Sequence, residues 1–326
     1  MMASGYSNAV VDHLLEQGDV RGAVALVEHY SASGNRDACF QLAMWLLVGS
    51  PIARDLSRAM LALNAAAAAG HGDAALMEVA LVANGAGGSP DWPRALGLLR
   101  RAGEQGNAIA REHLALIEAM ALDAAGDPRH LPPAEILNDS PRIFRLSKLL
   151  TPAECEHLAL SAANLLQPAL VFDPQTNRMV HHPVRTSDNA VVGPTRESLV
   201  VQAILRRVAA ATGTDIGQGE QVSLLRYSPG QQYRPHLDAI TGSTNQRIKT
   251  VLLYLNEGFG GGETRFDELG IEVVPRGGDA LIFDNVLADG RPDPRARHAG
   301  LPVRAGVKWV ATRWIRAAPY SPWNPN

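Results

Sequence analysis

The chain has 326 residues, of which 46% are hydrophobic and 19% are charged, and its formal net charge at pH 7 is -3. This length allows two domains, and this composition is typical of a folded protein rather than of a disordered one. The small negative charge provides no broad basic field, so we expect no nucleic-acid partner. No run of about 18 apolar residues is present, so we expect no membrane span.

Residues 6–125 repeat themselves. Gly34, Gly70 and Gly106 begin matching segments at steps of 36 residues (70 − 34 and 106 − 70), and Asp55 and Asp91 begin a second pair at the same step. Each unit reads as two helices joined by a glycine-containing turn, and stacked units of this kind share one core. We predict an all-α helical-repeat solenoid. The pattern resembles Sel1-type repeats, which are relatives of tetratricopeptide repeats, and this resemblance implies a protein-binding role.

The helical period is lost between Asp123 and Pro141, where proline, glycine and aspartate accumulate. We therefore predict a linker over residues 126–140 and a second domain over residues 141–318. This domain begins with a helix at Thr151, which has Pro152 and Glu154 in capping positions. A second helix is expected at about 196–211.

Short strands follow Gly219, separated by glycine and proline turns, as in a sandwich or small barrel. The expected strands are Gln221 to Tyr227, Ile248 to Asn256, Glu263 to Phe266, Ile271 to Val274, Asp279 to Phe283 and Val307 to Ile315. The predicted fold class is therefore α+β.

The sequence His-x-Asp occurs twice. In His236-Leu237-Asp238 the surroundings predict a strand or its end, where residues two apart share one face. In the second copy, at residues 71–73, the surroundings are helical and the two side chains diverge, so we expect no metal site there. Together with His298, the first copy forms a 2-His-1-carboxylate set, which holds iron in oxygenases and leaves positions open for a co-substrate and dioxygen.

Three segments resemble prolyl 4-hydroxylases, namely RYSPGQQYRPHLD (226–238), TVLLYLNEGFGGGET (250–264) and HAGLPVRAGVKWVATRWIR (298–316). The resemblance covers about Pro141 to Arg316. It implies a double-stranded β-helix, or jelly roll, supported by helices. It also implies Fe(2+), 2-oxoglutarate and O2 as cofactors, with L-ascorbate often needed to rescue over-oxidised iron.

The resemblance also assigns residues to roles. It makes His236, Asp238 and His298 the iron ligands, and Lys308 the cation for the distal carboxylate of 2-oxoglutarate; an unpaired buried carboxylate would otherwise cost several kcal/mol. Tyr227 and Thr250 match positions that hydrogen-bond this carboxylate. Further matches line the substrate pocket: Arg185, Tyr233, Trp314 and Thr264. The triple glycine Gly260 to Gly262 is expected to be a tight turn that lets the backbone crowd the site.

The implied reaction is hydroxylation of prolyl residues in a protein or peptide, with decarboxylation of 2-oxoglutarate to succinate. The first residues lack an export signal, and Cys39 and Cys155 have no CxxC spacing. We therefore expect a cytoplasmic enzyme whose substrate is not secretory-pathway collagen, with the repeats as a docking arm. Two alternatives stay open: an oxygenase of the same class acting on a free amino acid or small molecule, and a non-enzymatic repeat adaptor.

Overall fold

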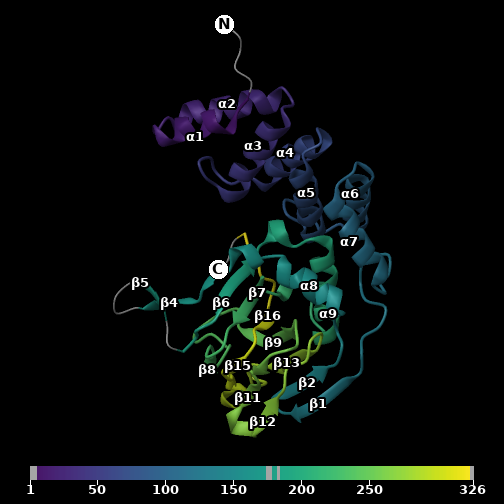
Figure 1. Cartoon of the computed structure of the whole chain (residues 1–326), viewed down its shortest axis with the longest axis vertical. Helices are drawn as coiled ribbons and strands as arrows, with labels where there is room; N and C mark the ends of the chain where they lie inside the picture. The colour runs from purple at the N-terminus through teal and green to yellow at the C-terminus, as the bar shows by residue number, and fades with distance from the viewer. Residues whose placement is uncertain (1–5, 174–177, 182–183, 324–326) are drawn as a thin grey trace. The chain divides into compact units, whose positions relative to one another are not determined.

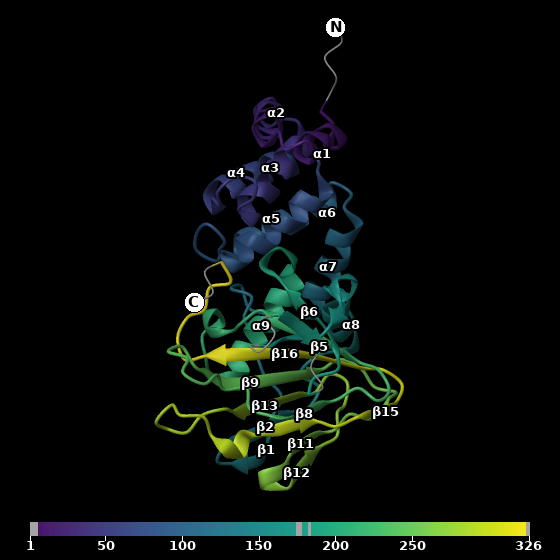
Figure 2. The same cartoon turned by 90° about the vertical axis from the view of Figure 1, so that its left-hand side faces the viewer.

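The structure is a computed structural model, and it describes residues 6–173, 178–181 and 184–323 (Figures 1 and 2). Its contacts divide the chain into two compact units. The first comprises the chain up to Met120 with Ala124–Gly126 and Pro194–Gln202, and the second comprises the remainder. Residues 134–139, inside the range expected to be a linker, form a strand. The domain ranges 6–125, 126–140 and 141–318 stay a prediction.

The first unit is built from helices in which each one packs against the next. These are α1 (Asn8–Glu16), α2 (Val20–Ala32), α3 (Arg36–Val48), α4 (Leu56–Ala68), α5 (Gly72–Asn84), α6 (Trp92–Glu104) and α7 (Ala108–Ala119). Helices α2, α4 and α6 begin 36 residues apart, and so do α3, α5 and α7. The predicted helical repeat is confirmed.

Local capping explains why the helices start where they do. Asp19, Asp55 and Asp91 each accept a hydrogen bond from the backbone N–H three residues later, which satisfies a donor that the first helical turn leaves free. At α5 the capping residue is His71, whose Nδ1 accepts from Ala74 N at 3.2 Å. The second His-x-Asp copy is therefore a helix cap and no part of the metal cluster found among the described residues.

The second unit contains two antiparallel sheets that face each other across an apolar core (Figure 2). The larger sheet has the strand order β1-β2-β13-β9-β16-β7-β6-β3, and the smaller has the order β12-β11-β14-β8. From β7 onward the chain passes back and forth between the two sheets, which is the topology of a double-stranded β-helix. The predicted jelly roll is confirmed.

The strands of the larger sheet are β1 (Ala134–Asp139), β2 (Arg142–Leu146), β3 (Gln167–Pro168), β6 (Asp188–Val192), β7 (Val222–Tyr227), β9 (Arg247–Tyr254), β13 (Ala280–Asp284) and β16 (Lys308–Arg316). Those of the smaller sheet are β8 (Tyr233–His236), β11 (Thr264–Phe266), β12 (Ile271–Val273) and β14 (His298–Gly300). Two separate pairs are β4 (Leu170–Asp173) with β5 (Arg178–His181), and β10 (Gly260–Gly261) with β15 (Val303–Ala305).

Two α-helices accompany the sheets in the sequence, α8 (Pro152–Leu160) and α9 (Leu199–Thr212). The expected capping box of α8 is present: Thr151 Oγ1 accepts from Glu154 N, and the Glu154 carboxylate accepts from Thr151 N. Short 3-10 turns occupy Ala163–Leu165, Pro194–Arg196, Ile216–Gln218, Asp267–Leu269 and Pro294–Ala296. Among the described residues, no helix is both long and apolar enough to cross a bilayer.

Candidate active site

Pairing of β8 with β14 brings the three expected iron ligands together. His236 ends β8 and lies directly opposite His298, which begins β14. Asp238 follows two residues after His236. One potential ligand atom from each residue lies within 4.8 Å of the others, and His236 Nε2 and His298 Nε2 are 3.5 and 3.7 Å from the Asp238 carboxylate. Side chains from distant parts of the sequence thus converge on one point.

Both imidazoles are oriented by backbone carbonyls. His236 Nδ1 is 2.9 Å from Arg234 O, and His298 Nδ1 is 3.1 Å from Ala296 O. A carbonyl can only accept a hydrogen bond, so each Nδ1 carries the proton and each Nε2 presents its lone pair to the shared point. Burial lowers the pKa of His298 to about 4, so its ring is neutral at physiological pH. Two imidazoles and one carboxylate fit a divalent iron ion.

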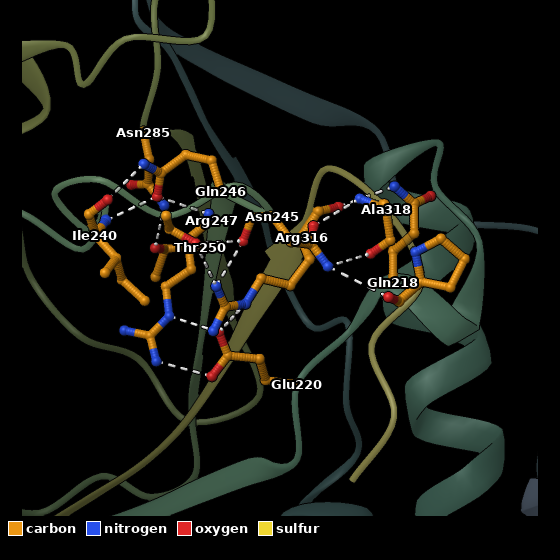
Figure 3. A network of polar contacts seen from close by, with 12 residues as sticks. Gln218, Glu220, Ile240, Asn245, Gln246, Arg247, Thr250, Asn285, Arg316 and Ala318 are labelled. Carbon is orange, nitrogen blue, oxygen red and sulfur yellow. Dashed lines mark hydrogen bonds and ion pairs between the residues drawn. The ribbon is translucent and has the colours of Figure 1, made fainter. Parts of the chain in front are cut away.

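The Asp238 carboxylate is buried and held by hydrogen bonds. Burial alone would raise its pKa, but the nearby His236 and His298 side chains and the hydrogen bond from Thr250 keep the pKa well below its usual value. Thr250 Oγ1 donates to Asp238 Oδ2 at 2.7 Å. Asn285 Nδ2 donates to Thr250 Oγ1 at 2.9 Å (Figure 3). These hydrogen bonds hold the Asp238 carboxylate in place and stabilise its ionised form.

In this structure Thr250 contacts Asp238, and its expected hydrogen bond to 2-oxoglutarate stays a prediction. Its side chain is fully buried, it is not among the residues that line the site cavity, and its hydroxyl donates to Asp238. Thr250 lies on the same face of β9 as Leu252, which does line the cavity. Alternation along the strand therefore predicted the correct face but not the neighbour that the hydroxyl contacts.

The Thr250→Val variant is expected to bind a divalent metal about 10- to 100-fold more weakly, because partners that orient a ligand typically contribute that much. Valine has a similar shape and cannot donate a hydrogen bond to Asp238. A titration with Mn(II), a redox-stable substitute for Fe(II), followed by electron paramagnetic resonance measures the Kd. Thr250→Ser keeps the hydroxyl and should restore most of the affinity. Equal Kd values for Thr250→Val and the unchanged protein would contradict this role.

A cavity lies beside the three ligands. The expected site residues that line it are Arg185, Tyr227, Tyr233, Thr264, Lys308 and Trp314. The sequence prediction missed other lining residues, namely Leu225, Leu252, Gly300, Val310 and Thr312. Lys308, Val310, Thr312 and Trp314 are every second residue of β16 and so share one face of the strand. Counting every second residue from Lys308 would therefore have predicted Val310 and Thr312 as lining residues.

Lys308 is a buried cation that lines this cavity. It is 4% exposed, and its Nζ donates to Gly262 O at 2.6 Å and lies 5.6 Å from the centre of the Tyr227 ring. Gly262 has a φ of +73°, and a Cβ added there would come within 3.0 Å of Lys308 Cδ. The triple-glycine turn therefore does crowd the site, as expected, and leaves room for the lysine stem.

Burial lowers the pKa of Lys308 to about 8, although the charge of Glu263 opposes this shift. The ammonium is therefore present below about pH 8 and is lost as the pH rises through this value. We expect the Kd for 2-oxoglutarate to increase above pH 8, by about tenfold per pH unit until the pKa of the complex is reached. Calorimetric titration with Mn(II) present, from pH 7 to 9.5, measures this. A Kd that stays constant over the range would exclude Lys308 as the carboxylate partner.

Arg185, Tyr233 and Trp314 form one wall of the cavity. Arg185 and Tyr233 face each other in an isolated β-bridge, with the guanidinium 5.3 Å from the ring centre. The Tyr233 ring also stacks on His236. Trp314 lies under the guanidinium of Arg247, 3.8 Å from the ring centre. The wall thus combines aromatic faces with cationic groups directly beside the metal ligands.

Comparisons with known proteins agree with this geometry. The model of the 2OG-Fe(II) oxygenase superfamily matches residues 222–316. Prolyl 4-hydroxylase 1 of Arabidopsis thaliana is 37% identical over 201 residues, which cover 56% of this chain and 71% of that protein.

Two solved structures are also similar to parts of this chain. The viral collagen prolyl hydroxylase from Paramecium Bursaria Chlorella virus-1, in its 2OG complex, is 28% identical with a TM-score of 0.44, covering 54% of this chain and 96% of that one. A Sel1 repeat protein from Oxalobacter formigenes is 21% identical with a TM-score of 0.30, covering 33% of this chain and 84% of that one. From the sequence match to the plant enzyme, this chain belongs to the prolyl 4-hydroxylase family of Fe(II)- and 2-oxoglutarate-dependent dioxygenases.

Proposed function

We propose that this enzyme hydroxylates prolyl residues of a protein or peptide and decarboxylates 2-oxoglutarate to succinate, with L-ascorbate as an accessory reductant. The observation that carries the proposal is the convergence of His236, Asp238 and His298 beside a cavity that contains Lys308. The 37% identity to a plant prolyl 4-hydroxylase supports a prolyl substrate.

Bound Fe(II), together with 2-oxoglutarate and O2, supplies the oxidising chemistry. The two histidines and Asp238 would hold the ion and leave its remaining positions open. Lys308 would pair with the distal carboxylate of 2-oxoglutarate, since a buried ammonium needs an anionic partner and provides charge-assisted hydrogen bonds. Apolar side chains of Leu225, Leu252 and Val310 keep water away from the reacting groups.

The aromatic wall suits a prolyl peptide. Tyr233 and Trp314 line the cavity and would offer apolar aromatic surface to a pyrrolidine ring. Trp314 Nε1 is buried and has no hydrogen-bond partner among the described residues, so it is available to donate to a peptide carbonyl. Arg185 places a second donor on the same wall. These groups would hold the peptide while the metal site acts on one carbon of the ring.

We further propose that the helical repeats recruit the substrate protein, because a second binding site raises the effective concentration of a weakly bound peptide. The expected compartment is the cytoplasm, which is supported by the two buried cysteines, Cys39 and Cys155, both of them free thiols. Recruitment predicts a lower KM for a whole substrate protein than for a ten-residue peptide around the same proline.

The experiment that tests the reaction uses the full chain with Fe(II), 2-oxoglutarate and ascorbate. Proline-rich peptides and free L-proline are offered in separate reactions, and mass spectrometry measures the gain of one oxygen atom, alongside succinate formation. Peptide hydroxylation is the expected result. Oxidation of free proline alone would favour the small-molecule alternative, and succinate without oxidised proline would contradict a prolyl substrate.

A further inference from the structure

The loop between β8 and β9 carries Asp238 and reaches β9 at Gln246 and Arg247. None of Ile240, Asn245 and Gln246 lines the site cavity. Their side-chain and backbone polar groups nevertheless form a connected set of hydrogen bonds with the segment that follows β16 (Figure 3). This set determines where the Asp238 backbone can lie.

Gln246 holds the loop from one side. Its Oε1 accepts from Ile240 N at 2.7 Å, and its Nε2 donates to Ile240 O at 2.8 Å. The side-chain amide thus pairs with Ile240 as a neighbouring strand would pair with it. Because Ile240 is only two residues after Asp238, this pairing limits the movement of the backbone that carries the carboxylate.

Asn245 connects the same loop to the C-terminal segment. Its Oδ1 accepts from Ala318 N at 2.9 Å, and its Nδ2 donates to the carbonyls of Ala318 and Pro319 at 3.2 and 3.3 Å. The backbone carbonyl of Gln246 accepts from Ala317 N at 2.8 Å. Residues 317–319 therefore lie beside the loop, and their backbone groups are hydrogen-bonded to Asn245 and Gln246.

A buried carboxylate anchors this arrangement. Glu220 is 9% exposed and pairs with Arg247 at 2.5 and 2.7 Å and with Arg316 at 2.6 Å. Arg316 Nη1 in turn donates to Asn245 O at 2.6 Å. The Glu220 carboxylate binds both guanidinium groups and so connects the start of β9 to the end of β16. The loop before β9 and the segment after β16 are therefore held at the same point.

We infer that Asn245 and Gln246 are positioning residues for the metal centre: with residues 316–319 they form a clamp that holds Asp238 in register with His236 and His298. The inference rests on the proposed role of Asp238 as a ligand. The clamp contributes no ligand atom, and its effect is to keep the carboxylate preorganised so that metal binding need not order the loop.

The test is a Mn(II) titration of the full chain, followed by electron paramagnetic resonance, together with thermal unfolding of each variant. Gln246→Ala removes both bonds to Ile240, and Asn245→Ala removes the link to Ala318 and Pro319. Asn245→Asp keeps the acceptor for Ala318 N and loses the two donors. The matched control is Asn138→Ala, since Asn138 Nδ2 donates to Pro141 O at 2.7 Å and braces a turn between β1 and β2.

We expect Gln246→Ala and Asn245→Ala to raise the Kd for Mn(II) about tenfold, and Asn245→Asp to raise it less. The control Asn138→Ala should lower the melting temperature as much as these variants do and leave the Kd for Mn(II) unchanged. Unchanged Kd values in both Asn245 variants would overturn the clamp, and so would an equal increase in Asn138→Ala. If Gln246→Ala does not fold, the Asn245 variants decide. Asp238→Ala in the same titration separates the two hypotheses, because undiminished Mn(II) binding there would refute the ligand assignment itself.

Discussion

Replacement of Asp238 by alanine is expected to reduce Fe(II)-dependent succinate formation to background. The variant loses the only carboxylate among the three converging side chains, so two imidazoles would be left to hold a dication. The change also leaves the Thr250 hydroxyl without its acceptor, at a cost of about 1–3 kcal/mol. The variant also no longer has to bury a charged carboxylate, and this gain in stability offsets the cost. We therefore expect the variant to fold, with an unchanged circular dichroism spectrum.

The second His-x-Asp copy offers a matched control for this variant. Asp73 has the same sequence spacing from a histidine but lies in the first turn of α5. Asp73→Ala should therefore retain full turnover. If instead Asp238→Ala keeps its activity, the carboxylate is not an iron ligand and the 2-His-1-carboxylate interpretation fails.

Replacement of Lys308 by alanine is expected to raise the KM for 2-oxoglutarate by about 100- to 4,000-fold. Removing one partner of a buried ion pair costs about 3–5 kcal/mol, because the other charge stays buried and unpaired, and each 1.4 kcal/mol corresponds to a factor of ten. The Kd for Mn(II) alone should change little, since Lys308 donates to Gly262 O rather than to a ligand. Initial rates of succinate formation with Fe(II) measure the KM, and calorimetry measures the Kd for Mn(II).

Lys249 supplies the control for this second variant. It lies on β9 and pairs with Asp284, and it does not line the cavity. Lys249→Ala should keep the 2-oxoglutarate KM of the unchanged protein. An unchanged KM in Lys308→Ala would mean that another cation binds the carboxylate, and Arg185 would be the next residue to replace, since it lines the same cavity.

The sequence was most informative where structure depends on near neighbours. The helical repeat could be predicted because each unit carries its own capping residue and its own turn glycine, and Gly34, Gly70 and Gly106 all adopt positive φ. The capping box of α8 could be predicted for the same reason. The longer strands were predicted from their composition, whereas β8 and β14 are too short to show a clear period.

The candidate ligands were predicted from their residue types and the His-x-Asp spacing, but the roles of the site residues came from the resemblance to a family, because the spacing of His236 and His298 does not by itself indicate that they meet. Thr250 illustrates the limit of that approach. Its strand and its face were correct, but the contact of its hydroxyl depends on Asp238 and Asn285, which lie on other segments. No pattern in the sequence around Asn245 indicates that it pairs with Ala318.

By itself, the sequence determined the helical repeat, the alternating strands and the identity of the ligand types, since these depend on hydrogen bonds and side-chain periodicity within a few residues. Only the tertiary structure decided that β8 pairs with β14, that Thr250 donates to Asp238, and that residues 317–319 are hydrogen-bonded to the loop that follows Asp238. The physical reason is that these contacts join segments distant in the chain, whose meeting depends on how both sheets close around one core.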